Sequence, residues 1–312
     1  MKIKRVMTEV VTAILVVGSP AISAPKTNMT GAPTQMVITM RPALGDNRSD
    51  GLEAADVTVL RGKTPVPVVR LETLSGDLAD MQLFVLLDDS TRSSSLAIQL
   101  PELKTFIESL PATTQVAVGY MRNGTFGLAQ GFTADHREAA RALRLPASIP
   151  GENGSPYFVL SDLAKHWPSK QSTNRRAVLM LTDGVDPYYG AADMDDPYVS
   201  AAIHDVLKEG VMVYSIYLRG AGFYGRGDGV TNFAQSHLIE VSEDTGGHAY
   251  SLGFTDPVTI SPFLKDFKDR LDNQYRVTIE ALKLNEKGVQ PVKLRSELRG
   301  LKIEAPTHVY VR

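Results

Sequence analysis

Two hydrophobic patterns divide the chain into a middle part and two ends. In the middle, segments such as 82–87 and 176–181 are apolar at nearly every position, as in strands buried on both faces of a parallel sheet. These runs alternate with segments of helical periodicity, and such alternation is typical of an α/β fold. The pattern predicts strands at 82–87, 115–121, 176–181, 211–217 and 248–251, and helices at 103–110, 135–143, 157–166, 198–209, 233–244 and 260–271. We expect Thr133 to cap the second of these helices.

Both ends of the chain have the shorter, alternating pattern of antiparallel strands. It occurs at 36–40, 56–60 and 67–71, and again at 275–279, 292–295, 301–303 and 309–311. Because chain ends often lie close together, we predict that these segments form one small antiparallel β-domain. The predicted fold is therefore α/β, with a doubly wound, mostly parallel central sheet flanked by helices and this β-domain beside it.

The first residues have the pattern of a secretion signal. Lys2, Lys4 and Arg5 precede an apolar stretch at 6–17, and small residues at 21–24 offer a cleavage site. The alternative is a membrane anchor, but the stretch is short against the ~20 residues that a span requires. The predicted division is a signal peptide at 1–24, a leader and β-segment at 25–79, the α/β domain at 80–272 and a β-segment at 273–312. We therefore expect an exported protein, periplasmic or extracellular, with no membrane span after cleavage.

Composition removes several classes of function. The chain contains 0 cysteines, which excludes disulfides, thiolate catalysis and cysteine zinc sites. The formal net charge is −2 and no run of Lys or Arg occurs after the first residues, so nucleic acid is not an expected partner.

Polar side chains follow the predicted buried strands. Asp88 and Ser90 come directly after the first strand, and Asp183 follows the strand at 176–181. A loop at 151–155, which ends in Ser155, opens a helix. Ligands bind open α/β sheets at the carboxyl ends of the strands, and oxygen-rich loops suit a hard divalent cation.

Residues 86–90 and 181–184 resemble the two aspartate motifs of von Willebrand factor A (VWA) domains. The resemblance covers about residues 80–272 and implies a metal-ion-dependent adhesion site with Asp88, Ser90, Ser155 and Asp183 as ligands. It further implies Mg²⁺, or alternatively Mn²⁺ or Ca²⁺, with an acidic side chain of a protein partner completing the coordination. Almost the whole mature chain also resembles the exported VWFA-related proteins common in Acidobacteria.

One position departs from the VWA motif. Arg92 stands where the family has a serine ligand, and arginine cannot bind a cation. Arg92 either points to solvent, or places its guanidinium beside Asp88 and Asp183 in place of a metal. We assign Arg92, Asp89 and Asp186 to the partner-binding surface.

Two further motifs each allow two interpretations, and the sequence is compatible with three functions. Asp186, Asp193, Asp195 and Asp196 form either a second cation site or, as we favour, a solvated loop. The glycine-rich segment at 220–225 matches a nucleotide-binding pattern, but no helix follows it directly, which favours a surface loop. The preferred function is a non-enzymatic protein-binding module. The alternatives are a structural envelope protein with a metal-free site and, less favoured, a metal-dependent hydrolase, for which Glu152 is the only general base in these loops.

Overall fold

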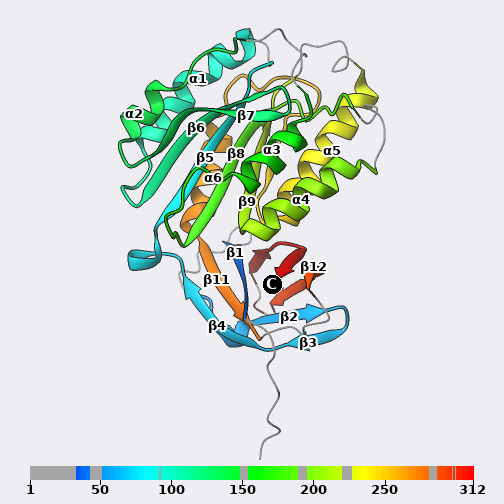
Figure 1. Cartoon of the computed structure of the whole chain (residues 1–312). Coiled ribbons are helices and arrows are strands. Elements are labelled where there is room, and N and C mark those ends of the chain that lie inside the picture. The colour runs from blue at the N-terminus through cyan, green and yellow to red at the C-terminus, as the bar shows by residue number, and fades with distance from the viewer. Residues whose placement is uncertain are drawn as a thin grey trace, which may run out of the picture.

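The computed structural model describes residues 33–42, 51–90, 93–147, 154–188, 195–219, 227–280, 287–296, 298 and 300–312. The signal segment, Arg92, Glu152, Asp193 and the glycine-rich segment at 220–225 lie outside the described residues. Figure 1 shows an α/β unit above a smaller unit made of strands, with the C-terminus in the smaller unit.

The α/β unit is built on a six-stranded sheet in the order β10-β9-β8-β5-β6-β7. All neighbouring strands run parallel except β6 and β7, which are antiparallel. Counted along the chain from β5, this is the doubly wound order 3-2-1-4-5-6, whose switch point lies between β5 and β8. The strands are β5 (Met81–Asp88), β6 (Thr114–Arg122), β7 (Thr125–Thr133), β8 (Arg175–Thr182), β9 (Val211–Tyr217) and β10 (Ala249–Tyr250).

Helices cover both faces of this sheet. One apolar core joins the sheet to α1 (Ser93–Glu108), α2 (His136–Arg141) and α6 (Ser261–Asp272). A second core joins the opposite face to α3 (Pro156–Lys165), α4 (Pro197–Glu209) and α5 (Asp228–Asp244). The predicted α/β fold with a mostly parallel sheet flanked by helices is therefore confirmed.

Three local predictions differ from the structure. β7 was not predicted, and α1 begins at Ser93, well before the predicted start. The cap of α2 is Asp135 rather than Thr133, because the Asp135 carboxylate accepts hydrogen bonds from the amides of Arg137 and Glu138. The Thr133 hydroxyl instead accepts one from the amide of Asp135.

The remaining strands form a β-subdomain from both ends of the chain, as predicted. Its largest sheet has the order β14-β1-β11-β4, and β1 pairs antiparallel with β11 and β14. These strands are β1 (Thr34–Pro42), β4 (Val68–Thr73), β11 (Gln274–Ile279) and β14 (Leu301–Glu304). A three-stranded sheet and a two-stranded antiparallel sheet complete it. The first contains β2 (Val57–Arg61), β3 (Thr64–Val66) and β13 (Lys293–Ser296), and the second contains β12 (Gly288–Pro291) and β15 (His308–Val311). Short 3-10 turns lie at Ala54–Asp56 and Gly76–Leu78.

An ionic network joins α6 to the β-subdomain. The Asp266 carboxylate lies 2.6 Å from the Arg270 Nε and 2.6 Å from an Arg41 nitrogen on β1. Arg270, only 4% exposed, also pairs with Glu304 on β14. Burial alone would raise the pKa of Asp266, but hydrogen bonds from Arg270, Arg41 and Tyr250 outweigh it and lower this pKa to about 2. In the part of the chain that the structure describes, no helix has the length and apolar character needed to cross a bilayer.

Candidate functional site

Asp88 ends β5 at the carboxyl edge of the sheet, which is uppermost in Figure 1, and is buried. One carboxylate oxygen accepts hydrogen bonds from the Ser90 amide at 2.9 Å and the Ser90 hydroxyl at 2.6 Å. The other accepts from the Thr182 hydroxyl at 2.9 Å, at the end of the neighbouring strand β8. Two central strands thus place three oxygen-bearing side chains around one point.

Asp183 follows Thr182 and is electrostatically linked to Asp88. Burial raises the pKa of Asp183, and the nearby charge of Asp88 raises it further, to about 7. Burial likewise raises the pKa of Asp88, although hydrogen bonds from Ser90 and Thr182 oppose this. Desolvation is the largest cause of both shifts, and a neighbouring carboxylate adds to each, namely Asp88 for Asp183 and Asp89 for Asp88.

A second cluster forms around Asp186, which is 5% exposed. The Ser155 hydroxyl, at the N-cap of α3, donates to one Asp186 oxygen, and the Tyr188 amide donates to the other at 2.8 Å. Ser155 also accepts from the Tyr157 amide at 3.2 Å. The Tyr157 hydroxyl donates to the Gly184 carbonyl at 2.9 Å, which ties this cluster to the loop after β8.

Asp89 is 1% exposed and paired with Arg144. The guanidinium of Arg144 donates to both carboxylate oxygens, at 2.6 and 3.2 Å, and lies 3.8 Å from the centre of the Tyr120 ring. The Ala147 amide adds a third hydrogen bond to Asp89 at 2.9 Å. Asp89 therefore holds the loop at 142–147 against the end of β5.

The residues predicted from sequence thus occupy three neighbouring arrangements. Asp88 and Ser90 are hydrogen-bonded and Asp183 lies within electrostatic reach of Asp88, whereas the Ser155 hydroxyl is directed to Asp186. Asp89 and Asp186 make internal contacts instead of being exposed, and Arg92 lies outside the described residues.

Sequence reasoning gave no role to Thr182, Arg144 or Tyr157. Thr182 stands between a buried strand and Asp183, so its position was a usable signal. Arg144 is 55 residues from Asp89, and no local pattern connects the two.

No protein-family model and no curated protein sequence matches the chain. Solved structures resemble it at low identity. An aerotolerance-related membrane protein from Bacteroides fragilis is 14% identical, with 62% of this chain and 98% of that chain covered and a TM-score of 0.43. Proximal thread matrix protein 1 from the mussel byssus, with a zinc-occupied MIDAS motif, is 17% identical over 63% of this chain and 46% of that chain, with a TM-score of 0.43. The SpRpn10 VWA domain is 10% identical over 61% of this chain and 97% of its own length, with a TM-score of 0.39.

Three features of the fold agree with the predicted VWA resemblance. They are the sheet order with its single antiparallel strand, the helices on both faces, and the placement of Asp88, Ser90 and Asp183 after β5 and β8 at the switch point. The narrower resemblance to exported VWFA-related proteins stays a prediction. On its sheet order and the residues at its carboxyl edge, the α/β unit of this chain has a doubly wound fold of the kind that the predicted VWA resemblance implies.

Proposed function

We propose that the chain is an exported, non-enzymatic binding protein whose VWA-type domain recruits a protein partner at the carboxyl edge of the sheet. A divalent cation, Mg²⁺ or alternatively Mn²⁺ or Ca²⁺, is held there by Asp88, Ser90 and Asp183. The cation supplies positive charge to which an acidic side chain of the partner binds.

One observation carries this proposal, namely that the buried Asp88 carboxylate lies within electrostatic reach of the partly exposed Asp183 carboxylate. A buried charge is costly unless an opposite charge compensates it. Among the described residues, neither carboxylate forms an ion pair with a lysine or arginine. A bound cation would compensate both charges at once.

The side chains present fit a hard cation. Two carboxylates and the hydroxyls of Ser90 and Thr182 offer only oxygen ligands, which Mg²⁺ and Mn²⁺ prefer. The described residues contain no group of three or more His, Cys, Asp or Glu side chains suited to a metal, so such a site depends on hydroxyls and on the partner. This dependence agrees with a site that is degenerate relative to the VWA motif.

Two alternative functions make different demands on the site. A hydrolase requires a general base beside the cation, and Glu152, the base that the sequence offers, lies outside the described residues. A structural envelope protein requires Arg92 in the place of the metal, which would make the site a fixed salt-bridge cluster.

The test is a titration of residues 25–312 with Mg²⁺ and Mn²⁺. Calorimetry measures metal binding, and thermal unfolding measures the gain in stability. We expect the wild-type protein to be stabilised by about 2.7 kcal/mol at a cation concentration of 100 times Kd. Asp183→Asn should remove this stabilisation, because the remaining Asp88 provides a single carboxylate. Asp135→Asn, at the remote cap of α2, serves as the matched control and should keep it.

Two outcomes would contradict the proposed cation site. If Asp183→Asn binds the metal as tightly as the wild type, the proposed ligands are wrong. If only an Arg92→Ser variant responds to metal, Arg92 occupies the cation position and the structural alternative holds.

A further inference from the structure

Three aromatic rings lie together beside the site, and they come from three separate segments. Phe158 belongs to the first turn of α3, Tyr188 to the loop after β8 and Tyr198 to the first turn of α4. The ring centre of Phe158 lies 5.5 Å from that of Tyr188 and 4.4 Å from that of Tyr198. We call these three residues the ring platform.

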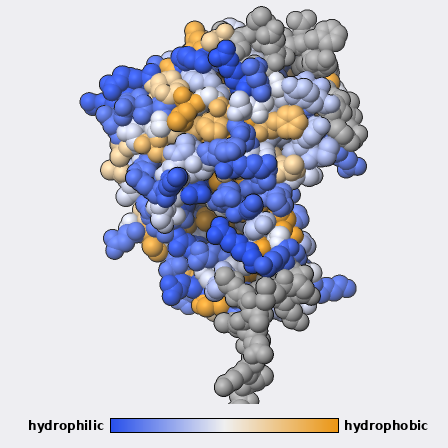
Figure 2. All heavy atoms as spheres, viewed as in Figure 1, coloured by the Kyte–Doolittle hydropathy of each residue, from blue (hydrophilic) through white to orange (hydrophobic). Residues whose placement is uncertain are grey.

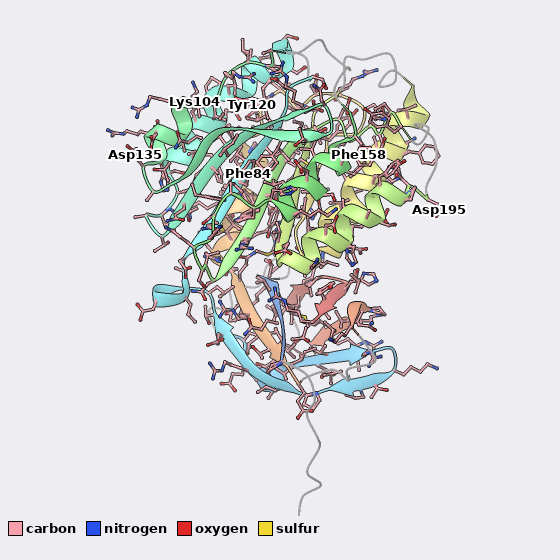
Figure 3. The ribbon with its side chains drawn as sticks, in the orientation of Figure 1. Phe84, Lys104, Tyr120, Asp135, Phe158 and Asp195 are labelled. Carbon is pink, nitrogen blue, oxygen red and sulfur yellow. The ribbon has the colours of Figure 1, made fainter. Side chains whose placement is uncertain are left out.

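The ring platform is accessible to a partner. Tyr188 is 62% exposed, and Phe158 and Tyr198 are partly exposed. Figure 2 shows an orange patch on the visible face at the place where Figure 3 labels Phe158, and Figure 3 labels Asp195 on the same side of the molecule. Aromatic surface of this kind, gathered in one place, is more typical of binding than a single exposed ring.

The backbone of the ring platform is fixed by the acidic residues around it. The Tyr188 amide donates to Asp186 at 2.8 Å, and the Tyr198 amide donates to Asp196 at 2.8 Å. Asp186 also accepts from Ser155, which caps the helix that carries Phe158. The backbone that carries the rings is therefore held in place before any partner arrives, which reduces the entropic cost of binding.

The surroundings of the ring platform are negative. Asp195, which is exposed, and Asp196 immediately precede α4, and Asp186 lies next to Tyr188 in the β8 loop. Burial raises the pKa of Glu240 on α5, and the charges of Asp244, Asp195 and Asp196 raise it further, although His237 opposes them. These carboxylates give the surface a negative electrostatic potential. A neutral apolar ligand gains nothing from it, whereas a cation is attracted both by this potential and by the faces of the rings.

We propose that the ring platform, together with Asp195, receives an arginine side chain of the protein partner. The planar guanidinium stacks on aromatic rings and donates to a carboxylate at the same time, which an ammonium group does less well. This inference rests on the proposed protein-binding role but not on the cation. It predicts that the partner carries a basic residue close to the acidic residue that would bind the cation.

The test uses a short acetylated Gly-Gly-Arg-Gly-Gly amide peptide and a matched peptide with citrulline, which keeps the shape of arginine without its charge. Binding to the full mature chain, 25–312, is followed by the aromatic ¹³C resonances of Phe158 and Tyr188, first with EDTA and then with Mg²⁺. We expect saturable shifts with the arginine peptide. Tyr188→Ala should weaken its binding by about threefold to fivefold. Asp195→Asn should weaken it as well, without altering the contact between the rings.

The control is Phe254→Ala, which removes an exposed aromatic ring, 42% accessible, from the loop after β10, and it should leave peptide binding unchanged. Equal shifts of the aromatic resonances with the arginine and citrulline peptides would overturn the inference. So would a result in which a neutral disaccharide binds to the rings and the arginine peptide does not. Metal stabilisation of the Tyr188→Ala variant is measured on the same samples. Its persistence or loss reports on the cation site separately from the ring platform.

Discussion

Gly184 follows Asp183 directly and adopts a backbone φ of 70°, which residues with a Cβ rarely adopt. A Cβ at this position would lie 2.7 Å from the Leu238 Cγ and 2.9 Å from the Ala234 carbonyl oxygen, both on α5. Glycine therefore lets α5 pack closely against the loop that carries Asp183.

We expect Gly184→Ala to lower the free energy of unfolding by about 2–4 kcal/mol, because strain in the backbone adds to a clash with α5. The matched control is Gly210→Ala, since Gly210 has a φ of 67° but nothing within 4 Å of the added carbon. It should cost only about 1 kcal/mol. Urea denaturation of both variants measures the difference, and equal costs would show that close packing at Gly184 is unimportant.

The side chains at the site differ in how well sequence predicts them. Asp88, Ser90 and Asp183 were found because each directly follows a buried strand, and the ends of neighbouring parallel strands meet. The direction of Ser155 toward Asp186 was not predictable, because it depends on where the loop after β8 places a residue 31 positions away. The burial of Asp89 depends in the same way on Arg144.

Glu102 links two helices that are far apart in sequence. From α1, one of its carboxylate oxygens accepts hydrogen bonds from the amides of Ile260 and Ser261, at 2.9 and 2.6 Å, and from the hydroxyls of Thr259 and Ser261. These amides open α6, whose own N-cap residue offers no side-chain hydrogen bond. Glu102 therefore caps α6 from a neighbouring helix.

Glu102→Gln should lower the free energy of unfolding by about 1 kcal/mol, because the carboxylate charge at a helix N-terminus is lost. Glu108→Gln is the control, as Glu108 is an exposed residue at the end of α1. Thermal unfolding followed by circular dichroism compares the two. Equal destabilisation would mean that the cap contributes nothing beyond a general effect of surface charge.

Most elements were predictable, and the missed ones have weak local signals. β7 contains Gly127 and Gly131 and is largely solvent-accessible, so it lacks the apolar run of the central strands. The part of α1 that was not predicted, 93–102, begins with serines and contains Pro101, which disfavours helix formation by itself. Packing of Leu96 and Leu100 into the core compensates for this, and that packing is a tertiary effect.

The contact between the α/β unit and the β-subdomain gives the whole molecule a dependence on pH. The pKa of Asp266 is about 2 when folded, against about 3.9 in an unfolded chain. Its ion pairs therefore stabilise the protein fully above about pH 4, and this stabilisation is lost as the pH falls toward 2.

We expect Asp266→Asn to cost about 1–2 kcal/mol at pH 7 and progressively less below pH 4, since the Asp266 side chain is 29% exposed and solvent weakens its pairs. Denaturation curves between pH 2 and 7 measure this. Part of the acid sensitivity should remain, because hydrogen bonds from Lys302 and Arg270 also lower the pKa of Glu304. The control is Asp272→Asn, which removes a more exposed pair with Lys268. An unchanged pH profile for Asp266→Asn would place the acid-sensitive contacts elsewhere.

The pairing of β1 with β11 and β14 also constrains the order of folding. A chain that is synthesised from its N-terminus exposes β1 long before either partner strand. The α/β unit has its own cores and can close during this interval, while β1 waits with an unpaired edge that is open to aggregation. Such distant pairings form slowly. The earliest strand in the described chain is thus among the last to find its place, and its open edge must be kept from aggregating until β11 and β14 have formed.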